Sequence, residues 1–321
     1  MKKHLFLIGL MVCSMATIAQ TESADKPESW YFKLGGSYFI QTAATDFPII
    51  SGTLPNNDVY AADGTTLVSR EANHGSFGQG FRSTFAAGYR FNTRLGVEMG
   101  INYYVGNNEK MAETTHRLVA AGPTFVSGKA EGRIRAFDLS PALVLFLGEH
   151  KGFESYTKVG VIVPVHGNLT IETNRTYTND TGTPILETFS KDVVKPKPTV
   201  GFMAAIGTSY KLGKNISVFA EVEYRNFTVH GDTKETEVYT ENGVDKLYTS
   251  TTFRPDASYS ASHVKYVDKL TANSNHYLFN PNTTTTNIEK DTTRPDDAMN
   301  DISSYVGISG LGLTLGLKYT L

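Results

Sequence analysis

Charged side chains recur at every second position of segments that are otherwise apolar. In residues 216–225, Glu221, Glu223 and Arg225 alternate with apolar residues. Residues two apart on a β-strand share a face, so Glu221 and Glu223 are a candidate pair of carboxylates for acid and base catalysis. The same alternation, followed through the chain, selects twelve charged residues: Lys33, Arg82, Arg90, Glu98, Asp138, Glu154, Lys158, Lys211, Glu221, Glu223, Arg225 and Lys318.

If these segments close into a narrow barrel, the twelve side chains face its interior. A barrel of eight strands is only wide enough for side chains to fill it, and an isolated buried charge costs several kcal/mol. We therefore expect the twelve charges to form ion pairs that plug the interior as a structural network. Two alternatives use the same residues: a narrow path for ions or water, and catalysis by paired carboxylates.

The alternation itself predicts eight antiparallel strands. It is clearest at the C-terminus, where leucines at 311, 313, 315, 317 and 321 and Tyr319 alternate with small or polar residues. Pro141 lacks a backbone donor, so we expect a bulge there. The predicted strands cover residues 29–40, 78–91, 95–105, 133–147, 153–165, 199–212, 216–227 and 304–321.

The connections between these strands alternate between short and long. Residues 92–94, 148–152 and 213–215 are short turns, whereas the long connections are residues 41–77, 106–132, 166–198 and 228–303. This rhythm is typical of transmembrane barrels, whose termini lie with the short turns on the periplasmic side. The fold class predicted is all-β: a transmembrane antiparallel eight-stranded up-and-down β-barrel with four long extracellular loops. It must be closed because no unpaired strand edge can face hydrocarbon.

Two long loops carry hairpin signals. Residues 238–248 contain Asn242-Gly243, a strong turn signal, and residues 169–173 could pair with residues 185–189. The last loop, residues 228–303, has twelve acidic residues and seven Lys or Arg, a net charge of -5 that predicts an acidic outer surface.

The N-terminus has the layout of a cleavable secretory signal. Lys2 and Lys3 precede an apolar stretch that ends near Ala19, where we place the cleavage. Val12 stands before Cys13 where a lipoprotein would have a small residue, which disfavours lipidation. The chain thus divides into a signal peptide, residues 1–19, and a single barrel domain, residues 20–321. That domain contains no cysteine, which excludes disulfides and thiolate metal sites.

The composition excludes one class of partner and favours a membrane interface. Loss of Lys2 and Lys3 takes the formal charge from -2 to -4, which gives no basic patch for nucleic acid. The chain has 29 glycines, 17 tyrosines and 18 phenylalanines, a composition suited to curved sheet that meets lipid. Six aromatic residues near predicted strand ends form an expected interfacial girdle: Trp30, Tyr89, Phe91, Tyr103, Tyr210 and Tyr319.

Together, the signal, the alternation, the loop rhythm and the closing strand resemble the small outer-membrane β-barrel family of the OmpX/OmpA type. The loop style is similar to the version found in the Gram-negative Bacteroidetes. The resemblance implies an outer-membrane location, surrounded by outer-membrane lipid and lipopolysaccharide. Since fold alone does not choose a function, our leading hypothesis is a non-enzymatic protein whose loops bind an extracellular partner or dock in a larger outer-membrane complex. The alternative is a narrow porin-like channel.

A second alternative is a lipid-modifying enzyme. Lipid A deacylases of outer membranes use a His/Ser pair, and the nearest match here is Ser260-Ala261-Ser262-His263, far out in the last loop. Six histidines fall in or beside long loops without metal-ligand spacing: His74, His116, His166, His230, His263 and His276. The sequence therefore assigns no catalytic residue, no metal ligand and no cofactor.

Overall fold

The computed structural model describes residues 29–42, 44–49, 54–119, 124–197, 199–276 and 294–321. Strands dominate this part of the chain, and its helix, α2, covers only Tyr259–Ser262. No helix among the described residues is long and apolar enough to cross a membrane. The predicted signal peptide and Cys13 lie outside the described residues.

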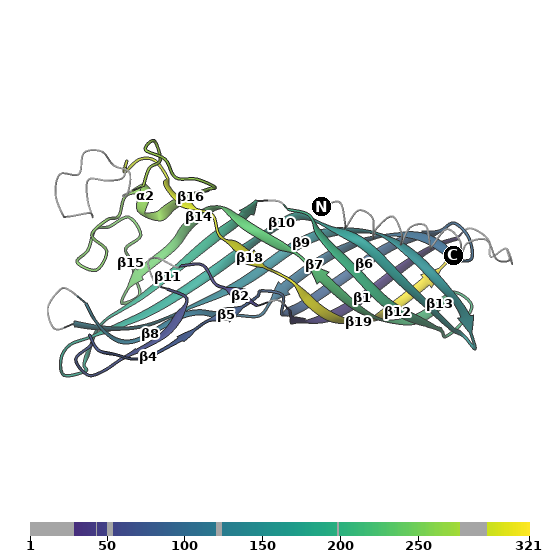
Figure 1. The fold of residues 1–321 in the computed structure, drawn as a ribbon, viewed down its shortest axis with the longest axis horizontal. Helices are drawn as coiled ribbons and strands as arrows, with labels where there is room; N and C mark the ends of the chain where they lie inside the picture. Colours follow the sequence, from purple (N-terminus) through teal and green to yellow (C-terminus); the bar gives the residue numbers. More distant parts are fainter. Residues whose placement is uncertain (1–28, 43, 50–53, 120–123, 198, 277–293) are drawn as a thin grey trace, which may run out of the picture.

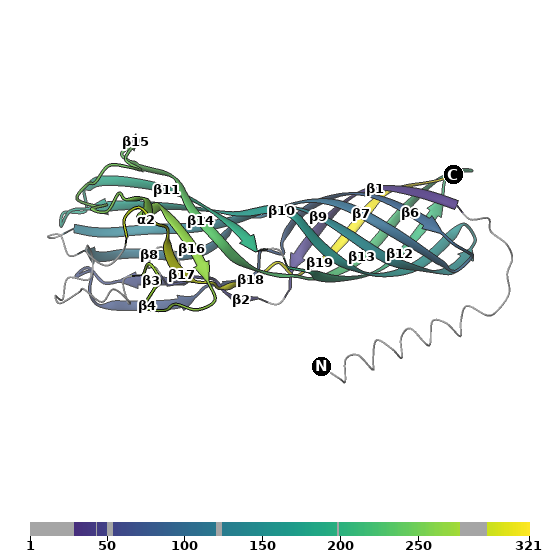
Figure 2. The same cartoon turned by 90° about the horizontal axis from the view of Figure 1, so that it is seen from above.

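A closed ring of antiparallel strands occupies one end of the molecule (Figures 1 and 2). In order of pairing it consists of β1 (Ser29–Gln41), β6 (Gly80–Arg90), β7 (Leu95–Gly106), β9 (Thr124–His150), β10 (Phe153–Thr178), β12 (Gly201–Lys211), β13 (Ile216–Asn226) and β19 (Gly310–Thr320). Pairing between β19 and β1, with Lys33 opposite Lys318, closes the ring. Each ring strand therefore finds backbone partners on both sides.

The outer surface of the ring is an apolar band. Along β7 and β13 exposed and buried residues alternate, as period-two geometry requires. Leu34, Phe202 and Ile206 keep 65%, 65% and 69% of their surfaces exposed. Soluble proteins rarely expose continuous apolar surface on this scale, so the band fits contact with lipid.

Strands β9 and β10 extend beyond the ring as a long antiparallel pair, and further strands pair with them there (Figure 2). We call this part the outer sheet. On one side β9 pairs with β8 (Glu109–Val119), followed by β3 (Asn56–Tyr60) and β4 (Leu67–Ala72). On the other side β10 pairs with β11 (Pro184–Lys197), followed by β14 (Thr228–Glu241), β16 (His263–Val267) and β17 (Met299–Ile302).

Four short strands complete the architecture. β15 (Val244–Asp245) and β18 (Tyr305–Gly307) pair with β14. β2 (Thr45–Asp46) and β5 (His74–Gly75) form a separate two-stranded sheet. Every strand except β2 and β5 belongs to one 17-stranded sheet, so the outer sheet and the ring share a continuous inner face.

Several expected element boundaries were wrong. The strands predicted over 133–147 and 153–165 are β9 and β10, of 27 and 26 residues, and the long connections carry strands of their own. The strand predicted over 304–321 is divided into β18 and β19. The strands of the outer sheet lack a continuous row of large apolar residues like the lipid-facing row of the ring, so the apolar alternation does not reveal them.

Two expectations about pairing were also corrected. Pro141 lies in register opposite Met99 rather than in a bulge, and the nearby register shift falls between Pro164 and His166. Residues 169–173 pair with residues 190–194 instead of 185–189. The hairpin expected within 238–248 is confirmed, since β14 and β15 flank Asn242-Gly243 and both turn residues have positive φ angles.

The apolar band leads to a prediction at Leu315, which is 59% exposed in the middle of β19. An arginine at the centre of a lipid-facing band costs about 2–4 kcal/mol. We expect Leu315→Arg to lower the free energy of unfolding from lipid vesicles by this amount, measured in urea through the fluorescence of Trp30. Leu315→Phe is the control and should unfold like the wild type. Equal stability of all three proteins would contradict lipid contact at this position.

Candidate functional site

Eleven of the twelve predicted interior charges are buried inside the ring. They comprise the cations Lys33, Arg82, Arg90, Lys158, Arg225 and Lys318 and the carboxylates Glu98, Asp138, Glu154, Glu221 and Glu223. The ring brings them together from different strands because each occupies an inward position of the same alternation. They form three layers along the interior.

The middle layer is a quartet of two lysines and two glutamates. Lys33 Nζ lies 2.8 Å from a carboxylate oxygen of Glu98 and 2.8 Å from one of Glu221. Lys158 Nζ contacts the same two carboxylates, at 3.1 Å and 2.7 Å. Each charge in the quartet therefore has two opposite partners, which is the arrangement that offsets the desolvation of buried ions.

The layer nearest the outer sheet is built on two arginines. Arg82 donates two hydrogen bonds to Glu223, of 2.6 Å and 2.8 Å. Arg225 donates to Asp138 at 2.7 Å, and Asn102 donates to the same carboxylate oxygen at 2.8 Å. Bidentate pairing of this kind fixes the orientation of both groups.

The third layer lies at the end of the ring that carries the short turns. Arg90 and Lys318 both donate to Glu154, at 2.6 Å and 3.0 Å, and the Arg90 guanidinium lies 4.0 Å from the centre of the Phe146 ring. A polar cavity of about 220 Å³ reaches this layer from the turns. Solvent can therefore approach the third layer, whereas the quartet lies deeper.

Two tyrosines that the search for charges missed complete the quartet. Tyr31 donates to Glu98 at 3.2 Å and Tyr156 donates to Glu221 at 2.7 Å. A Cβ on Gly88 would lie 2.1 Å from the Tyr31 ring, and one on Gly207 would lie 2.7 Å from the Tyr156 ring. Glycine is required here because the rings cross the space that a side chain would occupy. Tyr31 and Tyr156 each lie two residues before a lysine of the quartet, Lys33 or Lys158, and therefore face the interior. This spacing could have predicted their positions.

Lys211, the twelfth predicted interior charge, lines the cavity at the mouth of the ring and is not buried in one of the three layers. It is the last residue of β12, where the strand leaves the ring, and its side chain is 50% exposed. Its Nζ contacts both carboxylate oxygens of Glu149, at 2.9 Å and 2.7 Å. Lys211 keeps the inward phase of Ser209, but it is exposed because it lies where the strand leaves the ring.

The predicted girdle aromatics lie on the outside of the ring. Trp30, Phe91, Tyr103, Tyr210 and Tyr319 are 41–49% exposed, with Tyr89 partly buried between its neighbours. Trp30 and Tyr89 pack with ring centres 5.1 Å apart, and Tyr89 and Phe91 with centres 5.5 Å apart. Of the six, Tyr103 lies toward the outer-sheet end of β7, and the others lie beside the short turns.

An apolar cluster lies on the inner face where the ring meets the outer sheet. Its buried members are Phe47, Phe77, Tyr104, Met111, Ala112, Ala130, Ile134, Leu169 and Ile171. Phe77 and Met111 have no exposed surface, and Tyr104 donates to the backbone oxygen of Phe77 at 2.8 Å. Sequence analysis missed this cluster because Phe47 and Phe77 come from a long connection outside the alternating segments.

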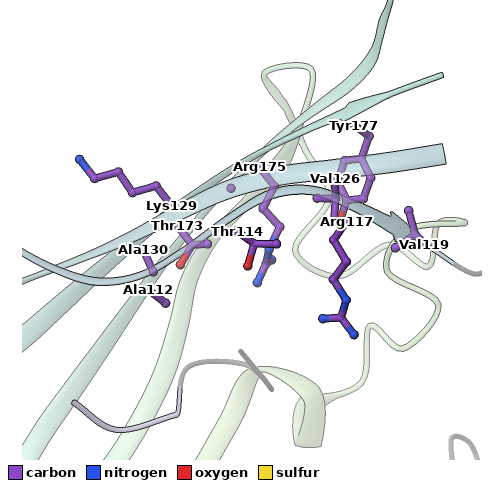
Figure 3. Close-up of a pocket in the computed structure, with 11 residues that line it drawn as sticks. Ala112, Thr114, Arg117, Val119, Val126, Lys129, Ala130, Thr173, Arg175 and Tyr177 are labelled. Carbon is purple, nitrogen blue, oxygen red and sulfur yellow. The ribbon is translucent and has the colours of Figure 1, made fainter. Parts of the chain in front are cut away.

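Further out, the inner face forms a pocket of about 180 Å³ that we call the arginine pocket (Figure 3). It is lined by Ala112, Thr114, Arg117, Val119, Val126, Gly128, Lys129, Ala130, Thr173, Arg175 and Tyr177, from β8, β9 and β10. Arg117 and Arg175 extend to the same side of the sheet, whereas Lys129 points away from them (Figure 3). The lining contains three basic residues and no acidic one. Such a pocket can hold an anionic group.

The histidines do not form a metal site among the described residues. His74 contacts Asp46, His116 stacks on Phe125, and His230 lies 3.1 Å from the Ser303 hydroxyl. His166 lines a small apolar pocket beside Pro164, and His276 is buried.

Ser262 and His263 come within hydrogen-bond distance, as the enzyme alternative requires. Ser262 Oγ lies 3.0 Å from His263 Nδ1, and His263 Nε2 lies 3.7 Å from Glu235. However, Ser262 is only 1% exposed, and its hydroxyl is also within hydrogen-bond distance of the backbone oxygens of Ser258 and Tyr259 at the start of α2. A buried hydroxyl that contacts backbone oxygens is poorly placed to attack a lipid ester.

The quartet leads to a prediction about stability. Glu221→Gln leaves Lys33 and Lys158 sharing one carboxylate, and breaking a buried ion pair costs about 3–5 kcal/mol. We expect that loss in the free energy of unfolding, measured in urea through Trp30 fluorescence. Glu149→Gln removes a more exposed pair and should cost less than about 1 kcal/mol. Equal effects of the two substitutions would argue against the quartet.

A search of curated proteins found no match. Among solved structures, the chain is similar to the outer membrane protein OprG from Pseudomonas aeruginosa, with 9% identity over 92% of this chain and 97% of that chain, and a TM-score of 0.40. It is also similar to a major outer membrane protein from Thermus thermophilus, with 12% identity over 92% and 99% of the two chains, and a TM-score of 0.31. Scores this low carry no argument on their own.

The family comparison is decisive. The model of the outer membrane protein beta-barrel domain matches residues 5–260, which is most of the chain. The ring of paired strands and its apolar outer band are what such a domain requires. The chain therefore belongs to the outer membrane protein beta-barrel domain family and is a protein of the outer membrane.

Proposed function

We propose that this protein is a non-enzymatic outer-membrane barrel whose outer sheet binds an extracellular partner. In this proposal the eight ring strands span the membrane, as in small barrels of the OmpX/OmpA type. The signal peptide is removed, and both termini and the short turns face the periplasm. The outer sheet then projects from the cell, next to lipopolysaccharide and to any neighbouring protein of a larger complex.

The proposal rests on a difference between the ring and the outer sheet. Side chains fill the interior of the ring, whereas the outer sheet contains a pocket. Three charged layers occupy the ring, and the apolar cluster follows them toward the outer sheet. The arginine pocket lies beyond that cluster on the same inner face. The outer sheet therefore offers a pocket in which a ligand can bind.

A porin-like channel would need a continuous polar passage. The cavity at the short turns ends at the layer of Glu154 and Lys318, and the quartet and the apolar Phe77 and Met111 lie beyond it. A filled path of this kind favours a binding protein over a channel. The buried hydroxyl of Ser262 likewise favours a non-enzymatic role.

Planar-bilayer recordings of the purified protein test the choice between binding protein and channel. We expect no steady unitary currents from the wild type, because buried ion pairs occupy the interior. A general porin reconstituted in the same way is the control for insertion. Steady single-channel currents that change when Glu221 or Arg225 is neutralised would overturn the proposal.

A further inference from the structure

The arginine pocket holds two guanidinium groups. Within the part of the chain that the structure describes, no carboxylate lines the pocket beside Arg117 and Arg175. Neighbouring charges are already paired: Asp58 accepts from Arg70 at 2.7 Å and 2.8 Å, and Lys129 lies 2.7 Å from Glu131. The two arginines thus remain available for an anion from outside.

A β-bulge in β8 aims Arg117 into the pocket. Thr114 lies opposite Gly128 on β9, but Arg117 lies opposite Val126, so β8 contains one extra residue between them. Regular pairing would place Arg117 opposite Phe125, with its side chain on the other face of the sheet. Bulges commonly redirect a side chain in this way.

The bulge holds a backbone conformation that most residues avoid. His116 has a φ angle of 58°, in the left-handed region that disfavours side chains branched at Cβ. Its ring stacks on Phe125, with centres 4.2 Å apart, and its backbone N–H donates to the Ser127 hydroxyl at 2.9 Å. Unusual conformations of this kind are retained where the surrounding structure enforces them, often at binding sites.

The floor of the pocket is built from small residues. Gly128 lies under Arg175, and a Cβ there would lie 2.7 Å from Arg175 Cγ. Ala112 and Ala130 are the neighbouring floor residues. Burial raises the pKa of the Tyr177 phenol, with the charge of Arg175 acting in the opposite direction, so Tyr177 remains a neutral hydrogen-bond donor.

We infer that the arginine pocket binds a phosphoryl group, an inference that rests on the proposed binding function of the outer sheet. Two planar guanidinium groups match the oxygens of a phosphoryl group better than point charges would. The hydroxyls of Thr114 and Thr173 add donors beside them. The small residues of the floor leave space for the group that carries the phosphoryl. The basic pocket can attract an anion although the last long connection, residues 228–303, has a net negative charge.

Calorimetry on the full-length protein in lipid nanodiscs tests this inference with glucose 6-phosphate as the probe. We expect binding that is weakened at least about tenfold by Arg117→Gln and by Arg175→Gln, as expected for loss of a charge-assisted hydrogen bond. Lys110→Gln is the matched control and should bind like the wild type, because Lys110 lies on β8 outside the pocket and contacts Glu113 at 2.9 Å. Glucose, which lacks the phosphoryl group, should not bind. Absence of binding, or equal binding by all variants with intact Trp30 fluorescence, would overturn the inference.

The positioning role of His116 has its own pair of variants. His116→Gly accepts the left-handed backbone and should keep wild-type affinity, whereas His116→Val opposes it and should weaken binding as Arg117→Gln does. Equal affinity of these two variants would contradict the role of the bulge.

Two competition arms identify the source of the ligand. Displacement of the probe by lipopolysaccharide, but not by its dephosphorylated form, would identify a membrane glycolipid. Displacement only by soluble sugar phosphates would identify a soluble saccharide. If the barrel conducts and still binds the probe, the proposed function is refuted and the pocket assignment stands. If the barrel is closed but does not bind the probe, the pocket assignment is refuted and the proposed function stands.

Discussion

A ring of strands with an apolar outer surface must pair every backbone group internally, and this constraint shapes the rest of the molecule. Closure of the ring between β1 and β19 removes both sheet edges. It also leaves an interior too narrow for anything but side chains. Charged residues on that inner face must then neutralise one another, which Lys33, Glu98, Lys158 and Glu221 do through four contacts.

The kind of residue on the inner face of the sheet changes along the length of the molecule. Ion pairs fill the ring, an apolar cluster around Phe77 and Met111 follows, and a basic pocket lies in the outer sheet. All three sections use the same two long strands, β9 and β10, which continue from the ring into the outer sheet (Figure 1). A scaffold that is closed at one end can therefore present an organised surface at the other.

Sequence pattern predicted the ring well because lipid and interior impose opposite demands on successive residues. Glu98, Glu221 and Arg225 could be assigned to the interior from alternation alone. Alternation could not show that Lys211 is exposed at the mouth of the ring, since this depends on where β12 ends. The outer sheet was underestimated because its inner face is only partly apolar, which interrupts the apolar alternation. The orientation of Arg117 could not be predicted, since one extra residue in β8 changes the face of the sheet on which it lies.

The central claim is that the interior lysines are buried in ion pairs. Amine-specific chemical labelling of the folded protein, quantified for each lysine by mass spectrometry, tests it most directly. Lys33 and Lys158 should resist labelling until the barrel unfolds, whereas Lys129 and Lys211, which are 44% and 50% exposed, should react at once. Labelling of Lys33 and Lys158 as fast as Lys211 in the folded barrel would contradict the account.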